Sequence, residues 1–442
     1  MSQSTIVLII LVIMSISFFV GYIPLAITAL AVPLALELTG VLKASEAWAG
    51  FSNTSVVVLI PLFMLGGVLK KTTFLEWLKK SIVGAIGGDM GKSGKRILLL
   101  CMLASFILPT FLSPVAVMSI LCPVLISIAD EAKYSRKALL KSCADVACTG
   151  NNILPFGTAL TTYMTYNAYL EAAGASERFN LIDPFACKIP IYVVYFLFIY
   201  FVGSKYWEKR DKVSEAKTPV QITSAADTSK RSSKKSTLSP FQNKLGIGLF
   251  FGAAAAMILA SAFTNIPLYI VGFIFCIIAV ATKIISEKEL FDSVSWSTVF
   301  LLACTLPLST AMTNSGCNDM ISHLISLLIG DTRNAVVIAA VFFLAAFIIT
   351  QFISNRAVGA VFRPIAIAAA VGLGVDPRFT LLAELYGSSL STLTPMATPA
   401  EAIIYNEGKF KMGEFFIGSV APCIVWFAAF LIWFPLSFKF LY

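Results

Sequence analysis

The chain carries two arginines, Arg356 and Arg363, inside apolar sequence that offers neither of them water. Ionisable residues in membrane-spanning segments are expensive and usually functional. The planar guanidinium group matches an oxygen pair of a carboxylate or sulfate. We therefore predict that Arg356 contacts an anionic substrate, the alternative being that it pairs with a fixed acid. Arg363, just before Pro364, is expected to be structural or to snorkel.

Small and polar residues interrupt two predicted helices, 137–170 and 379–405. The first is broken at Gly150 to Asn152 and the second at Ser391 to Pro395. In a membrane, irregular backbone survives only where it lines a cavity or is buried in protein. Each break starts a half-helix whose free N–H groups and partial positive charge favour an anion. These breaks are therefore predicted to form the substrate site together with Arg356.

Polar side chains at the breaks are further candidate contacts. Thr158 and Thr398 offer hydroxyl donors to a substrate. Asn151 and Asn152 lie at the first break, where we favour a role in the site over a plain helix cap.

Acidic residues precede both breaks: Asp145 by five residues and Glu384 by seven. They could carry a coupling proton, or they could simply pair with Lys141 and Arg363. The predicted ion-coupling residues are these two acids and the first residue of each break, namely Asp145, Gly150, Glu384 and Ser391. Glu401, one turn after the second break, could cap the half-helix.

An internal repeat relates the two interrupted regions. Ser113-Pro114-Val115-Ala116-Val117 matches Ser354 to Val358 at an offset of 241 residues. Pro155-Phe156-Gly157-Thr158 matches Pro395 to Thr398 at an offset of 240. Two halves with interrupted helices at corresponding places are typical of secondary transporters. Ser52-Asn53-Thr54 lies outside this register and is predicted to be a helix N-cap.

Composition places the chain in a membrane. Of 442 residues, 58% are hydrophobic and 13% are charged, which is about half the charged fraction of a soluble protein. The net charge of +9 reflects basic loops and does not indicate a nucleic-acid partner. The chain has one histidine and nine cysteines, and the cysteines lack C-x-x-C spacing. We therefore expect no metal site, no cofactor and no disulfide framework, and we do not expect an enzyme.

The predicted fold is an all-α polytopic membrane protein with about ten transmembrane spans. Each half contains a re-entrant helical hairpin followed by a broken helix, and the two halves are inverted repeats. The predicted units are residues 1–204 (hairpin 96–130, broken helix 137–170), the linker 205–244, and residues 245–442 (hairpin 334–374, broken helix 379–405).

The distribution of basic residues predicts orientation in the inner or plasma membrane. With the linker 205–244 in the cytoplasm, 25 Lys and Arg residues lie in cytoplasmic segments and six outside, Lys188 among the six. This split satisfies the positive-inside rule. Both termini are then expected outside.

These residues resemble the divalent anion/sodium symporter family of dicarboxylate, citrate and sulfate carriers. The resemblance is sharpest from Phe352 to Pro364 and in PMATPAEAIIY, residues 395–405. It implies a homodimer in the lipid bilayer that moves a small dianion by an elevator motion. It also implies two half-sites at the hairpin tips and breaks. The predicted substrate-binding residues are Ser113, Asn151, Asn152, Thr158, Ser354, Asn355, Arg356, Thr394, Pro395 and Thr398.

The hairpin tips depart from the Ser-Asn-Thr signature of the family. The first reads Ser113-Pro114-Val115, and the second carries Arg356 in place of Thr. Pro and Val side chains offer no oxygen to a sodium ion. The coupling ion could be sodium or a proton, and we predict a sodium-independent carrier of C4-dicarboxylates, proton-coupled or exchanging. The alternatives are a sulfate, other oxyanion or citrate transporter, a sodium/proton exchanger and, remotely, a membrane-embedded enzyme.

Overall fold

The structure is a computed structural model. It describes residues 2–20, 22–74, 77, 94–151, 153, 158–180, 183–211, 238–263, 266–317, 319–321, 323 and 334–441. Helices account for the regular structure in these ranges, and no strand occurs in them. The predicted all-α fold is confirmed.

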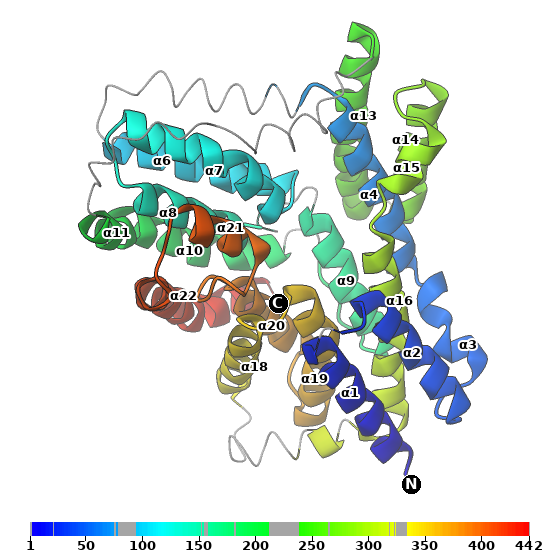
Figure 1. The fold of residues 1–442 in the computed structure, drawn as a ribbon. Coiled ribbons are helices and arrows are strands. Elements are labelled where there is room, and N and C mark those ends of the chain that lie inside the picture. Colours follow the sequence, from blue (N-terminus) through cyan, green and yellow to red (C-terminus); the bar gives the residue numbers. More distant parts are fainter. Residues whose placement is uncertain are drawn as a thin grey trace.

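Six apolar helices form an upright bundle on the right of Figure 1. Helix α16 packs on α2, and α4 packs on α13 and α14. The short helices α3 (Ala44–Ala47) and α15 (Glu287–Asp292) lie between them in the chain. The bundle consists of α1 (Gln3–Val20), α2 (Leu25–Leu38), α4 (Thr54–Lys71), α13 (Pro240–Phe263), α14 (Leu268–Ala281) and α16 (Trp296–Asn314).

The remaining helices form a second body, in which two hairpins each pack on a broken helix (Figure 1). The first hairpin, α6–α7, lies on α8, and the second, α18–α19, lies on α20. Helix α9 reaches back to contact α4 and α16 of the bundle. The body consists of α6 (Gly94–Ile107), α7 (Pro114–Glu131), α8 (Arg136–Thr149), α9 (Thr158–Ala172), α10 (Asp183–Phe198), α11 (Ser204–Arg210), α18 (Ala335–Thr350), α19 (Asn355–Leu373), α20 (Pro377–Ser389), α21 (Pro399–Glu407) and α22 (Met412–Leu441).

Several described helices can cross a membrane by length and composition. Five have at least 18 residues and an apolar window: Thr54–Lys71, Phe185–Arg210, Trp296–Asn314, Asn355–Leu373 and Met412–Leu441. Shorter apolar helices are Gln3–Phe18, Leu25–Leu38, Leu268–Ala281 and Ala335–Thr350. Backbone hydrogen bonds satisfied within each helix allow this burial in lipid. The chain is a polytopic membrane protein, whereas the number of spans and the inverted halves stay predictions.

The predicted linker is too long at both ends. Helix α11 continues through Arg210, after a π-helical turn at Ile199–Gly203, and α13 begins at Pro240. Lys95 supports the first extension, because its ammonium contacts Ser204 Oγ at 2.6 Å and Glu208 at 3.0 Å. We placed the linker boundaries by charged composition. Charged residues indicate exposure to solvent, and the ends of helices are exposed to solvent as well. Residues 212–237 of the predicted linker lie outside the described residues.

Side-chain caps begin helices α4, α7 and α19. Asn53 caps α4 by accepting from the N–H groups of Ser55 and Val56, at 2.9 and 3.3 Å. The N-cap interpretation of Ser52-Asn53-Thr54 is therefore confirmed. Ser113 caps α7 and Ser354 caps α19 in the same way, each accepting from the N–H group three residues ahead. The two hairpin tips are thus built by one local device.

Candidate functional site

The second hairpin tip and the second break are joined by hydrogen bonds. Asn355 Nδ2 donates to Ser391 Oγ at 3.3 Å, and Thr394 Oγ1 donates to the Gln351 carbonyl at 2.8 Å. The Gln351 side chain, buried, donates to the Leu390 carbonyl at 2.8 Å and accepts from the Leu393 N–H at 3.1 Å. Gln351, which we did not predict, therefore holds the irregular backbone where the break begins.

Residues 390–398 form the break itself. Pro395 is buried in a turn, and Thr398 is the N-cap of α21, accepting from the Glu401 N–H at 3.3 Å. The predicted capping role of Glu401 is wrong, because Thr398 occupies that position and the Glu401 carboxylate points elsewhere. Helix α21 begins at Pro399, directly after the break, so its N-terminal end adjoins the break, and anion binding there stays a prediction.

The first break is described in part. Helix α8 ends at Thr149, with Gly150 as its C-cap and Asn151 half-buried after it. Helix α9 begins at Thr158. Asn152 and the Thr158 side chain lie outside the described residues, so their predicted contacts stay predictions.

Lys188 connects the first break to the C-terminal end of α20. Its side chain is 1% exposed on α10, and its ammonium donates to the Asn151 carbonyl at 2.8 Å and to Ser389 Oγ at 3.4 Å. We counted Lys188 on the outer side of the membrane, and this orientation stays a prediction; α22 packs on the helix that carries it. Among the described residues no carboxylate pairs with it, and residues 152–157 contain none. The cation lies at the C-terminal ends of α8 and α20, where the helix dipoles favour it.

Asp145 belongs to a buried cluster with Lys141 and Glu401. The Lys141 ammonium contacts Asp145 Oδ1 at 2.5 Å, the Thr392 carbonyl at 2.8 Å and Glu401 Oε2 at 3.1 Å. Both Lys141 and Glu401 are fully buried. The partnership of Asp145 with Lys141 was one of our alternatives, but the third member was missed, because Glu401 lies 260 residues away.

Glu384 belongs to a separate cluster with Arg363 and Tyr166. Arg363 Nε lies 3.5 Å from Glu384 Oε2, which also accepts the Tyr166 hydroxyl at 2.7 Å. The Arg363 guanidinium lies over the rings of Tyr166 and Tyr169. These contacts agree with the structural role expected for Arg363 and do not favour snorkelling.

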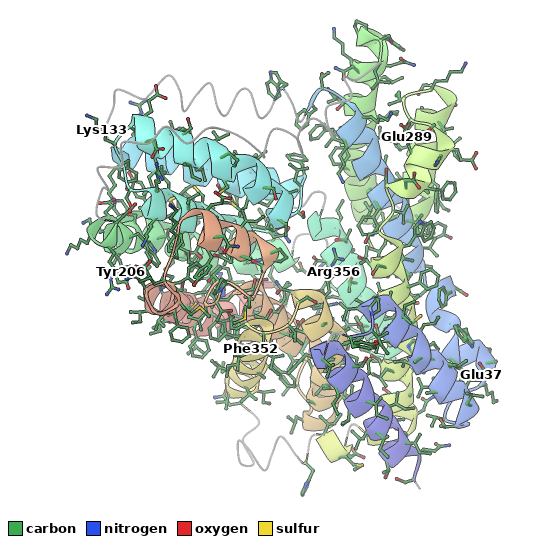
Figure 2. All side chains as sticks on the ribbon, in the orientation of Figure 1. Glu37, Lys133, Tyr206, Glu289, Phe352 and Arg356 are labelled. Carbon is green, nitrogen blue, oxygen red and sulfur yellow. The ribbon has the colours of Figure 1, made fainter. Side chains whose placement is uncertain are left out.

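Arg356 lies in the first turn of α19 with its side chain exposed. Figure 2 places it between α9 and the α19–α20 pair, and α9 contacts α19. No ion pair joins it to an acid in the described part of the chain. The alternative of a fixed acidic partner therefore gains no support, and the cation is available to a ligand.

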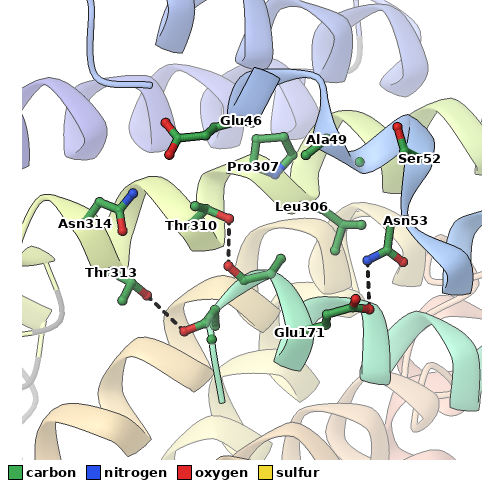
Figure 3. A pocket seen from close by; sticks show the side chains of 14 residues that line it. Glu46, Ala49, Ser52, Asn53, Glu171, Leu306, Pro307, Thr310, Thr313 and Asn314 are labelled. Carbon is green, nitrogen blue, oxygen red and sulfur yellow. Dashed lines mark hydrogen bonds between the residues drawn. The ribbon is translucent and has the colours of Figure 1, made fainter. Parts of the chain in front are cut away.

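A cavity of about 480 Å³ opens elsewhere, between α3, α9 and α16 (Figure 3). Its polar contacts include Asn53 Nδ2 to Glu171 Oε2 at 2.9 Å and Thr310 Oγ1 to the Ala172 carbonyl at 2.6 Å. Glu46 and Glu171 line it, and no Lys or Arg is among its lining residues. An acidic lining repels an anion, so this cavity is not the predicted substrate site.

Comparison with known families decides the class of protein. The citrate transporter (CitMHS) profile matches residues 7–385, most of the chain. The chain belongs to the citrate transporter family. An uncharacterized transporter of Methanocaldococcus jannaschii is 24% identical over 93% of this chain and 89% of its own length. The predicted resemblance to carriers of divalent anions is confirmed, and this citrate transporter family member is a transporter and not an enzyme.

Further relatives match over shorter stretches. A sodium-dependent low-affinity dicarboxylate transporter of Caenorhabditis elegans is 28% identical over 30% of this chain and 23% of its own length. Several others are likewise matched over less than a third of their length.

Two solved structures share the fold. They are the YdaH transporter of Alcanivorax borkumensis (TM-score 0.61, 12% identity, 92% of this chain and 88% of that chain) and MtrF of Neisseria gonorrhoeae (TM-score 0.62, 15% identity, 98% and 95%).

Proposed function

We propose that this transporter carries small divalent organic anions of the C4-dicarboxylate kind and does so without sodium. The observation that carries the proposal is Arg356, an exposed cation in the first turn of α19 with no acidic partner among the described residues. A cation at a helix N-terminus adds to the positive end of the dipole. A bound anion relieves both charges at once, and a carboxylate matches the guanidinium geometry.

The surrounding groups suit a second carboxylate. The half-helix α21 presents its N-terminus at the second break, and Asn355 and Ser391 lie within hydrogen-bonding distance of each other there. The relatives of Caenorhabditis elegans that carry dicarboxylates support this substrate class. Sulfate and citrate are the competing anions, and competition against labelled succinate separates them.

We expect transport without sodium because oxygen atoms at the first hairpin tip and the first break already accept hydrogen bonds from the protein. Ser113 Oγ serves as the α7 cap, followed by Pro114 and by Val115, which have no side-chain oxygen. The Asn151 carbonyl at the first break accepts the Lys188 ammonium. A sodium ion placed beside that ammonium would meet a like charge. Coupling would then use protons or exchange of one dianion for another.

The two bodies suit an elevator-type alternating access. The hairpins and both breaks belong to one body, whereas the bundle of α1, α2, α4, α13, α14 and α16 carries neither. Movement of the second body, which contains the hairpins and breaks, against the bundle would carry the substrate site through the bilayer. We propose that two such chains associate through their bundles as a homodimer in the inner or plasma membrane, with the linker cytoplasmic and both termini outside.

The test is uptake of labelled succinate into proteoliposomes, with and without an inward sodium gradient, and with internal succinate. We expect uptake that ignores sodium and is stimulated by internal succinate. Arg356→Gln should weaken apparent affinity tenfold or more, because a hydrogen bond to a charged group contributes about 1.5–3 kcal/mol. Arg378→Gln is the matched control, since Arg378 pairs with Asp376 at 2.6 Å away from the breaks. Sodium-driven uptake, or an unchanged Arg356→Gln variant, would overturn the proposal.

A further inference from the structure

The cluster of Lys141, Asp145 and Glu401 contains one more acid than base. Lys141 and Glu401 are fully buried and Asp145 is 3% exposed. In the described structure, the Lys141 ammonium is the one basic group that pairs with the two carboxylates. A buried excess charge is very costly, so a proton must neutralise it when the cluster is buried as in this structure.

Glu401 is the carboxyl group that has room for the proton. Its Oε2 accepts from Lys141, while its Oε1 is buried and has no hydrogen-bond partner among the described residues. The Asp145 and Glu401 carboxylates lie next to each other, because both contact the same Lys141 ammonium. Asp145 has the shorter contact with the ammonium, at 2.5 Å, so the proton belongs on Glu401 Oε1.

The other groups that face the two carboxylates are neutral. They are the Tyr195 phenol of α10, the Cys148 thiol of α8 and the Cys423 thiol of α22, with the Phe415 ring of α22 lying 4.3 Å from the Lys141 ammonium. Phenols and thiols are protonated at neutral pH. They therefore do not balance the extra acid.

We propose that Glu401, held by Lys141 and Asp145, binds and releases the proton that drives transport. The inference rests on the proposed function and names its coupling site. Protonation adds one H⁺ to the Glu401 carboxylate, which becomes a carboxylic acid that donates to Asp145. Deprotonation returns the proton to water and leaves the cluster with a net negative charge.

The cluster is connected to the substrate site through the second break. Lys141 holds the Thr392 carbonyl of the break at 2.8 Å, and Cys148 Sγ lies 3.6 Å from Oγ1 of Thr398, the α21 cap. Glu401 lies in the first turn of the same half-helix. A change of charge on Glu401 therefore alters the contacts that fix the break, and anion binding at the break must in turn alter proton affinity.

The test separates two modes of succinate transport in proteoliposomes. In the unmodified protein, an inward proton gradient should accelerate net uptake. Glu401→Gln, which mimics the protonated acid, should lose that acceleration at least tenfold and retain exchange against internal succinate. Glu414→Gln is the matched control, because Glu414 of α22 pairs with Lys137, which lies on α8 one turn before Lys141, and both side chains are partly exposed. Glu401→Gln that responds to the gradient as the unmodified protein does would overturn the proposal.

A second measurement does not depend on the substrate. The infrared spectrum of the unmodified protein should contain the carbonyl stretch of a protonated carboxylic acid, and Glu401→Gln should lack it. Absence of this band from the unmodified protein overturns the proton site. If succinate is transported in neither mode while the band is present and Glu401-dependent, the dianion proposal fails and the proton site stands.

Discussion

Two buried acids, Glu384 and Glu401, lie near the same helix break but in opposite electrostatic situations. Glu384 has one base, Arg363, and a phenol donor, so its cluster is balanced. Glu401 shares its base, Lys141, with Asp145. A balanced pair has no reason to exchange a proton, whereas a cluster with an extra acid does. The difference separates a fixed structural contact from a candidate coupling site within one body.

We expect the largest effect when the balanced pair of Arg363 and Glu384 is broken. Arg363→Met leaves the Glu384 carboxylate buried without its base, which typically costs about 3–5 kcal/mol. Denaturant unfolding of the detergent-solubilised protein measures it. The double variant Arg363→Met with Glu384→Gln should recover most of the loss, because no charge is left unpaired. Full stability of the single variant would show that the pair does not hold the hairpin.

The next largest effect is expected where α20, the helix that contains Glu384, packs closely on α18. A Cβ atom on Gly387 would lie 2.2 Å from the Phe343 carbonyl oxygen of α18. Gly387→Ala must therefore separate the two helices, at a cost of about 1–3 kcal/mol. The same substitution at Gly413, where an added Cβ meets nothing within 4 Å, is the control. Equal melting temperatures for the two variants would contradict the close packing.

A smaller effect is expected at the unbalanced cluster. Glu401→Gln removes the excess acid and keeps an oxygen for Lys141, so unfolding free energy should change by less than about 1 kcal/mol. Lys141→Met, in contrast, should destabilise as strongly as Arg363→Met, because it leaves buried acids without a base. If Glu401→Gln were the more harmful of the two, the cluster would be an ordinary ion pair.

The smallest effect comes from an exposed pair that serves as the reference. The hydrogen bond from Lys71 lowers the pKa of Glu289 to about 2, and both side chains are more than a third exposed. A lowered folded-state pKa stabilises above the ordinary Glu pKa and is lost as pH falls toward 2. Because solvent screens the pair, Glu289→Gln should cost less than about 1 kcal/mol at neutral pH. Thermal melts across this acidic range measure it.

Local sequence determined much of this protein. Apolar runs predicted the helices, and Ser113 and Ser354 marked the two hairpin tips, where each serine caps the helix that follows. Gly150 and Ser391 marked the breaks. The placement of Arg356 beside no described acid agrees with its predicted availability, although its role in transport stays a prediction.

Only the tertiary structure decided which charges meet. Lys188 was counted only as an outer basic residue from the sequence, yet α22 packs on its helix and its ammonium contacts the first break and the end of α20. Glu401 reads as a cap, yet it pairs with Lys141 from the other half of the chain. Composition and periodicity predict which segments are buried by the hydrophobic effect and where local hydrogen bonds form. The partner of a buried charge depends instead on how distant helices pack, and no local pattern records that.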